Sequence, residues 1–121
     1  MLEKLAFTMY PVKDTARARA FYEGTLGLVV GKHSPNGTWT EYDLPGGGCL
    51  ALFRTDDIAP SSSAGGSVAF EVDDPDATLA DLEAKGVSIK MRMIESPVCR
   101  MSVVVDPEGN SLLLHELRKS S

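Results

Sequence analysis

The sequence lacks the features that mark membrane-spanning or exported proteins. No apolar run approaches the roughly 20 residues that a membrane-spanning helix needs, and the first residues contain no apolar stretch typical of a signal peptide. Cysteine occurs only as Cys49 and Cys99, without the close spacing of a metal-binding or redox motif. We therefore expect a cytoplasmic protein whose thiols stay reduced.

Positive charge is also scarce. The sequence contains 12 Lys and Arg residues and 17 Asp and Glu residues, which gives a net charge of −5. The basic residues are scattered along the chain, whereas nucleic-acid-binding proteins usually gather them on one face. No stretch combines a basic face with an apolar face, as a membrane-surface helix would. We expect neither nucleic acid nor a membrane as a partner.

Hydrophobic residues make up 43% of the 121 residues, enough to form the core of one compact domain. The first half begins with a β-prone segment at residues 5–12. Asp14 then stands as a helix N-cap, and apolar residues recur at helical spacing to position 26, before Gly27. Short apolar segments separated by Gly- and Pro-rich turns fill residues 28–53 and predict antiparallel strands.

Residues 58–66 are small, polar and rich in Ser and Gly, so they form the best candidate linker. The pattern then restarts with a predicted strand at residues 67–72. Asp74 and Pro75 are typical of a helix start. Short strand segments separated by turns fill residues 87–117.

Both halves therefore have the same order of a strand, a capped helix, a glycine stop and three short strands. This internal repeat predicts an α+β fold of two tandem βαβββ modules, residues 1–57 and 67–121, within a single domain of residues 1–121. We expect the curved mixed sheets of the two modules to form an open cleft. Clefts of this kind commonly bind small molecules.

Several motifs in this order resemble one known family. They are DTARA at 14–18 with Phe21-Tyr22 and Leu26-Gly27, LPGG at 44–47, VAFEVDD at 68–74 and DPEGN at 106–110. The set resembles the vicinal oxygen chelate superfamily, which includes glyoxalase I, bleomycin-resistance proteins, fosfomycin-resistance enzymes and extradiol dioxygenases. The resemblance covers nearly the whole chain and implies the glyoxalase-like fold.

The resemblance also implies a divalent metal held by His, Glu or Gln side chains at four strand positions. In this sequence those positions are Phe7, Ala51, Ser67 and Leu113. Three of these side chains cannot bind a cation, and a lone serine is a poor ligand. We therefore predict no usual metal site and no cofactor, with an altered metal site as the alternative.

Strand alternation suggests which residues line the cleft. If Leu113 faces it, so does His115, and if Ser67 faces it, so does Glu71. A four-residue loop at the last turn would pair Ser102 with His115. The predicted ligand pocket consists of Phe7, Met9, Trp39, Ser67, Arg100, Ser102 and Leu113.

His115 and Glu71 are the candidate catalytic residues, because a histidine near a carboxylate can transfer protons. Four of these residues have alternative interpretations. His115 could form a structural hydrogen bond, Arg100 could form a structural ion pair, and Glu71 could be a solvated residue at the cleft edge. Trp39 could pack in the core or in a dimer.

We expect a small-molecule-binding protein that lacks the usual metal and holds a compact organic ligand in the cleft. The alternative is a lyase, isomerase or dioxygenase that uses His115 and Glu71 as an acid–base pair or in an altered metal site. A third interpretation is a regulatory or self-assembly module whose cleft is vestigial. The resemblance also implies a homodimer.

Overall fold

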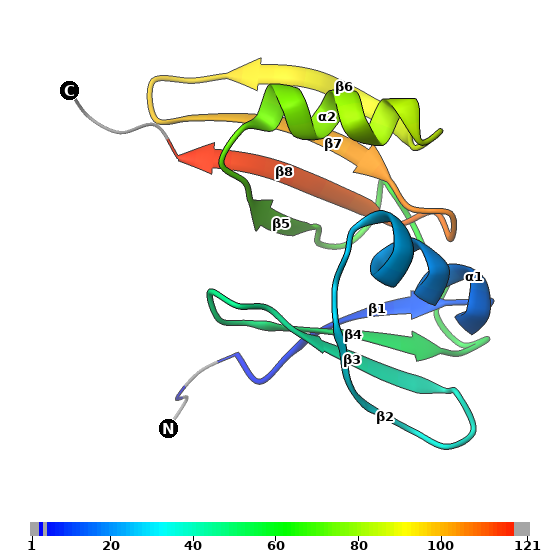
Figure 1. Ribbon diagram of the computed structural model, residues 1–121. Coiled ribbons are helices and arrows are strands. Elements are labelled where there is room, and N and C mark those ends of the chain that lie inside the picture. Colours follow the sequence, from blue (N-terminus) through cyan, green and yellow to red (C-terminus); the bar gives the residue numbers. More distant parts are fainter. Residues whose placement is uncertain (1–2, 4, 118–121) are drawn as a thin grey trace. The chain divides into compact units, whose positions relative to one another are not determined.

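The computed structural model describes residue 3 and residues 5–117. The chain consists of two compact units, Met1–Pro60 and Ser61–Ser121, and their boundary falls within residues 58–66. Each unit has one four-stranded mixed sheet and one helical segment in the order βαβββ (Figure 1). The predicted α+β class with two βαβββ modules is confirmed. None of the helices in the described part of the chain is long and apolar enough to cross a membrane.

Unit 1 contains one sheet and one helical segment. Its elements are β1 (Thr8–Val12), α1 (Thr15–Arg19), the π-helix η1 (Ala20–Thr25), β2 (Val30–His33), β3 (Trp39–Asp43) and β4 (Cys49–Arg54). The sheet order is β1-β4-β3-β2, in which β1 runs parallel to β4 and the other pairs are antiparallel. Pro11 lies inside β1, which is compatible with the sheet because β1 is an edge strand.

The predicted helix cap of unit 1 is confirmed. The Asp14 side chain accepts a hydrogen bond from the Arg17 backbone N–H at 3.0 Å. The helix widens into η1 before Gly27, whose φ of 76° is accessible to glycine without strain. The ring of Tyr22 stacks on Tyr42 of β3 at a centroid distance of 6.0 Å. The helical segment therefore covers one face of the sheet.

Unit 2 repeats this architecture. Its elements are β5 (Val68–Glu71), α2 (Pro75–Ala84), β6 (Ser88–Glu95), β7 (Cys99–Val105) and β8 (Ser111–Leu117). The sheet order is β5-β8-β7-β6, with β5 parallel to β8. Asp74 caps α2 as predicted by accepting a hydrogen bond from the Ala77 backbone N–H at 3.1 Å.

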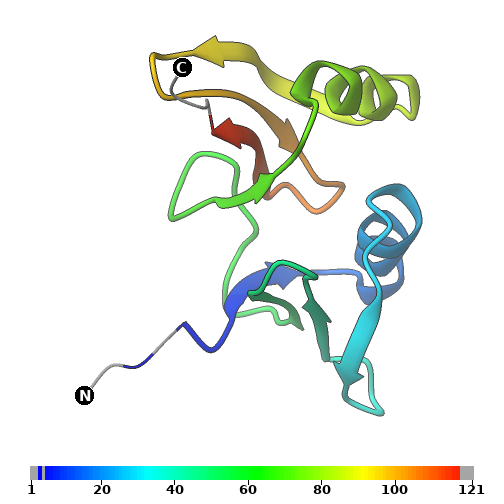
Figure 2. The same ribbon diagram turned by 60° about the vertical axis from the view of Figure 1, so that its left-hand side comes forward.

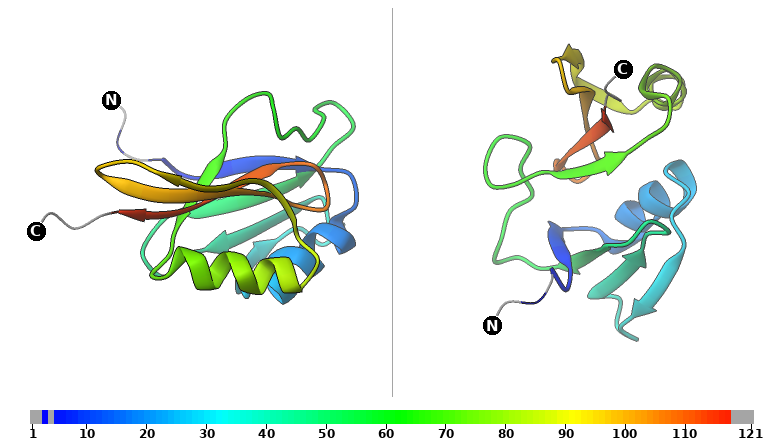
Figure 3. Two further views of the ribbon diagram at one scale, coloured as in Figure 1. Left: turned by 90° about the horizontal axis from the view of Figure 1, so that it is seen from above. Right: turned by 90° about the vertical axis from the view of Figure 1, so that its left-hand side faces the viewer.

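The helix α2 runs along one side of the unit 2 sheet (Figures 2 and 3). Its buried residues are Pro75, Leu79 and Leu82. On the sheet, Val104, Leu112 and Leu114 are also buried. These side chains alternate along β7 and β8 with a second set on the opposite face. Each sheet thus has a helix-covered face and a helix-free face, the latter defined by the strand residues that point away from the unit's own helix.

Candidate functional site

The helix-free face of unit 1 follows from the pairing of β3 with β4. Trp39 pairs with Phe53, Glu41 with Ala51 and Asp43 with Cys49. These residues alternate with Thr40 and Tyr42, which are buried on the helix-covered face. Met9 of β1 lies beside Ala51. The predicted pocket residues Phe7, Met9 and Trp39 therefore belong to one face, which also carries the carboxylates of Glu41 and Asp43.

Three aromatic side chains gather on this face, and we call Phe7, Trp39 and Phe53 the aromatic platform. The rings of Phe7 and Trp39 meet edge-to-face, with centroids 5.1 Å apart and planes at 84°. The rings of Trp39 and Phe53 lie 5.9 Å apart. The indole Nε1–H donates a hydrogen bond to Glu41 Oε2 at 2.7 Å. The indole is thus held by two rings and one charged acceptor, while Phe7 remains 46% exposed.

The region beside the platform is acidic. The Cys49 thiol donates to Glu41 Oε1 at 3.8 Å. Burial raises the pKa of Cys49, and the negative charges of Glu41 and Asp43 raise it further. A raised pKa keeps the thiol protonated at neutral pH and lowers its nucleophilicity.

On the helix-free face of unit 2, the strand pairing brings the two candidate catalytic residues together. Glu71 of β5 lies beside His115 of β8, and Ala69 lies beside Leu113. On the other side of β8, Met101 pairs with His115. His115 therefore lies on a largely apolar face, next to one carboxylate.

The contacts of Glu71 hold the His115 ring in place. His115 Nδ1 lies 2.6 Å from Glu71 Oε1, and the Leu117 backbone N–H donates to Glu71 Oε2 at 2.8 Å. These two hydrogen bonds, that of His115 first, lower the pKa of Glu71. With Nδ1 engaged by the carboxylate, the ring can exchange a proton or accept a hydrogen bond through Nε2.

The predicted register of the last hairpin is wrong by one residue. Val105 pairs with Ser111, and Ser102 pairs with Leu114 instead of His115. The cause is a tight turn closed by Asp106. Its Oδ1 accepts hydrogen bonds from the backbone N–H groups of Glu108 and Asn110 at 2.9 and 2.8 Å, and the chain reverses over three residues.

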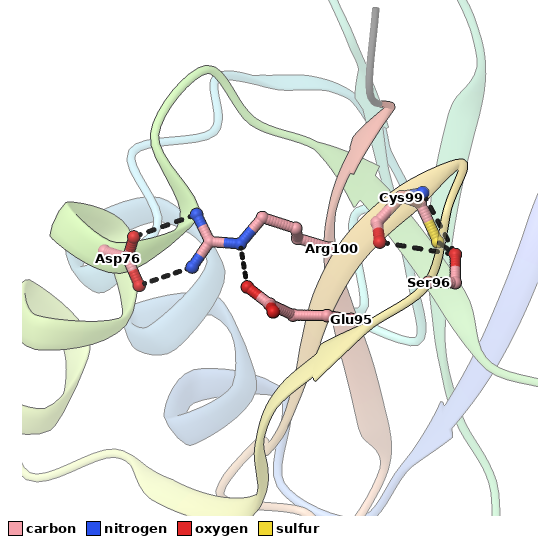
Figure 4. A network of polar contacts seen from close by, with 5 residues as sticks. All are labelled: Asp76, Glu95, Ser96, Cys99 and Arg100. Carbon is pink, nitrogen blue, oxygen red and sulfur yellow. Dashed lines mark hydrogen bonds and ion pairs between the residues drawn. The ribbon is translucent and has the colours of Figure 1, made fainter.

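This correction moves two predicted pocket residues to the helix-covered face. Ser102 is fully buried there. Arg100 reaches Asp76 of α2 at 3.0 Å and Glu95 of β6 at 3.0 Å (Figure 4). Arg100 therefore joins α2 to its sheet, which is the structural ion pair that the sequence left open. The predicted grouping of Arg100 and Ser102 with His115 is wrong.

The side chains present do not fit the divalent metal that the fold family implies. Phe7 and Ala51 on unit 1 and Leu113 on unit 2 offer no donor atom. The hydroxyl of Ser67 is hydrogen-bonded to that of Ser111. Across residues 3 and 5–117, no group of three or more His, Cys, Asp or Glu side chains is placed to hold a metal ion.

Sequence reasoning missed two residues of the unit 1 face. Glu41 anchors the indole, and Phe53 completes the aromatic platform. Strand alternation from Trp39 places Glu41 on the same face. To place Phe53 on this face, one must know how β3 and β4 pair across the turn at residues 45–48. That register pairs Phe53 with Trp39.

Comparison with known proteins identifies the family. The sequence matches the model of the Glyoxalase/Bleomycin resistance protein/Dioxygenase superfamily over residues 4–114. The chain therefore belongs to this superfamily, as its motifs suggested.

Three proteins are similar to this chain in sequence or in fold. The anthracycline biosynthesis protein DauV of Streptomyces sp. (strain C5) is 31% identical over 111 residues, which are 88% of this chain but 39% of that protein. This chain thus spans well under half of DauV. TnmS3, an antibiotic binding protein from Streptomyces sp. CB03234, is 26% identical with a TM-score of 0.81, covering 97% of this chain and 98% of its own. The lactoylglutathione lyase from Agrobacterium tumefaciens is 22% identical with a TM-score of 0.74, over 95% and 94% of the two chains, and shares the fold.

Proposed function

We propose that this protein binds a compact organic molecule on the helix-free face of a sheet, without a divalent metal. One observation carries the proposal. Apolar side chains, those of Phe7, Ala51 and Leu113, occupy three of the four positions where the family resemblance implies metal ligands. On unit 1 the same face presents the aromatic platform. Ligand sites in proteins are mostly apolar with a few well-placed polar groups. On unit 1 Glu41 supplies such a group, and on the helix-free face of unit 2 the His115–Glu71 pair does.

The similar proteins support this proposal. TnmS3 is described as an antibiotic binding protein and DauV as an anthracycline biosynthesis protein. A binding role for this chain would resemble that of TnmS3, whose whole length it matches.

A thermal-denaturation screen tests the proposal. The purified protein, treated with EDTA, is heated with each member of a panel of small organic molecules. A ligand present at 100 times its Kd raises the free energy of unfolding by about 2.7 kcal/mol. We expect at least one clear shift, with one ligand bound per chain by calorimetry. Binding that appears only after Zn²⁺, Ni²⁺, Mn²⁺ or Fe²⁺ is restored would contradict metal-free binding.

A second candidate function rests on the 2.6 Å contact between His115 and Glu71. A carboxylate-held histidine suits proton abstraction from a bound ligand. NMR in D₂O tests this function, because a catalysed proton transfer exchanges an acidic C–H of a bound ligand for deuterium. We expect His115→Ala to abolish the exchange and retain binding. Equal exchange rates in both proteins would rule out this role.

We also propose a homodimer, which the family resemblance implies. Light scattering at micromolar concentration checks this assembly. A mass near twice 13.0 kDa is expected, and a monomer mass would refute it.

A further inference from the structure

We propose that the helix-free face of unit 1 selects a planar aromatic cation, such as a fused-ring compound that carries a protonated amine. This inference rests on the proposed binding function and names the class of ligand. Its basis is the aromatic platform of Phe7, Trp39 and Phe53 together with the two carboxylates on the same face.

The platform is oriented before any ligand arrives. Edge-to-face contact with Phe7 and the tilted contact with Phe53 restrict the Trp39 ring. The hydrogen bond from Nε1 to Glu41 fixes its remaining rotation. A ring held in this way loses little conformational freedom on binding, so stacking with a flat ligand is favoured. Tryptophan is also the aromatic residue that attracts cations most strongly.

The electrostatics favour a positive ligand. Glu41 can accept about four hydrogen bonds, and Trp39 and Cys49 use two of its acceptor positions. A ligand amine can therefore donate to Glu41 without displacing the indole. Asp43 stands two residues along the same strand and is exposed, so a second negative charge adds to the attraction.

None of the described basic side chains forms an ion pair with Glu41 or Asp43. Arg54 is the basic residue of β3 and β4, and it forms an ion pair with Asp56 at 3.1 Å. On the neighbouring strand β2, Lys32 forms no ion pair with a described carboxylate. The raised pKa of Cys49, caused first by burial and then by Glu41 and Asp43, agrees with a negative potential at this face.

The test compares three compounds by calorimetry: proflavine, a planar cation; anthraquinone sulfonate, a planar anion; and cyclohexylamine, a cation without a flat ring. We expect proflavine to bind at least about tenfold more tightly than either of the others, the discrimination typical of one hydrogen bond to a charged group. Trp39 is the chain's single tryptophan, so quenching of its fluorescence reports binding, and the Trp39 variants test whether the platform is the binding site.

Two variants separate the contributions. Glu41→Gln keeps an acceptor for the indole N–H but removes the charge, and we expect proflavine to bind about tenfold more weakly. Trp39→Leu removes the stacking surface, and Trp39→Phe, which retains a ring, should partly restore binding. Asp81→Asn is the matched control, because it removes the same charge from an exposed ion pair with Lys85 on α2. Its affinity for proflavine should equal that of the native protein.

The outcomes distinguish this inference from the proposed function. Equal or tighter binding of the sulfonate, or unchanged proflavine affinity in Glu41→Gln, overturns the selection of a planar cation. In either case, shifts caused by other members of the organic panel leave the proposed function standing. The absence of any thermal shift across the whole panel refutes both.

Discussion

Replacing Tyr42 by phenylalanine tests the division of strand β3 into a structural face and a ligand face. Tyr42 is fully buried on the helix-covered face, and its hydroxyl donates to Glu23 Oε2 at 2.9 Å. The same carboxylate accepts from Arg19 Nε at 2.6 Å. Glu23 thereby ties η1 to the sheet, whereas Trp39 and Glu41 of the same strand point the other way.

The magnitude follows from these contacts. A hydrogen bond to a charged group contributes about 1.5–3 kcal/mol. Glu23 keeps its bonds to Arg19 and is about 30% exposed, so water replaces part of the loss. We expect Tyr42→Phe to lower the free energy of unfolding by about 1–2 kcal/mol. For a chain of this length, that loss lowers Tm by about 4–8 °C.

The effect should depend on pH. Arg19 first, and Tyr42 after it, lower the pKa of Glu23 below its ordinary value of 4.5. A carboxyl whose pKa is lowered by folding stabilises the native state above its ordinary pKa, and this stabilisation disappears as the pH falls through the folded-state pKa. The difference in stability between native protein and Tyr42→Phe should therefore be largest near neutral pH and shrink below about pH 4.5.

Denaturant unfolding at several pH values measures this difference, with Glu23→Gln completing a double-mutant cycle. Ligand affinity of Tyr42→Phe should equal that of the native protein at temperatures where both are folded. A pH-independent difference, or no coupling between the two sites, would refute the assigned contact. A loss of ligand affinity would refute the separation of the two faces.

Three further predictions concern unit 2. Carbon-13 NMR should show Glu71 titrating below the ordinary value of 4.5, and His115→Ala should move that titration upward, because His115 is the main cause of the lowered pKa; an unmoved titration would contradict the 2.6 Å contact. Ser102→Ala should leave the free energy of unfolding unchanged or raise it by up to about 1 kcal/mol, since the buried hydroxyl has no partner among the described residues; a marked loss measured in urea would show that the hydroxyl is bonded. Asp106→Ala should cost about 2 kcal/mol in the same assay, because the buried backbone N–H of Asn110 and the part-buried N–H of Glu108 lose their acceptor. A neutral result would rule out this turn as the cause of the hairpin register.

The order of elements was predictable from the sequence because local signals agree with the tertiary structure. Asp14 and Asp74 cap their helices as their positions indicated. Gly27, the glycine after the first predicted helix, adopts a positive φ angle, and so does Gly86 after α2. Such signals act over a few residues and depend little on the rest of the fold.

The registers of strands were harder to predict. The loop of the turn at residues 106–110 is one residue shorter than predicted. Residues of β7 that were predicted on the helix-free face, Arg100 and Ser102, therefore lie on the helix-covered face. On β6, irregularities shift the pairing between Ile89 and Ile94. The change of the first helix into the π-helix η1 could not be predicted from the apolar periodicity either. The widened turn keeps the same side of the helix buried.

The candidate site was predictable where it depended on one parallel pairing. Alternation along β5 and β8 placed Glu71 and His115 on one face, as observed. The contact between Trp39 and Glu41 was not predicted, since it depends on side-chain rotamers.

The most direct test of metal-free binding on the helix-free faces is a ¹H–¹⁵N NMR spectrum with the tightest ligand of the panel, recorded in EDTA. We predict that the indole N–H signal of Trp39 shifts, together with the backbone signals of Glu41, Phe53 or His115. The backbone signals of Tyr42 and Ser102 should stay in place. Shifts confined to the helix-covered faces, or shifts that require an added divalent metal, would contradict metal-free binding on the helix-free faces.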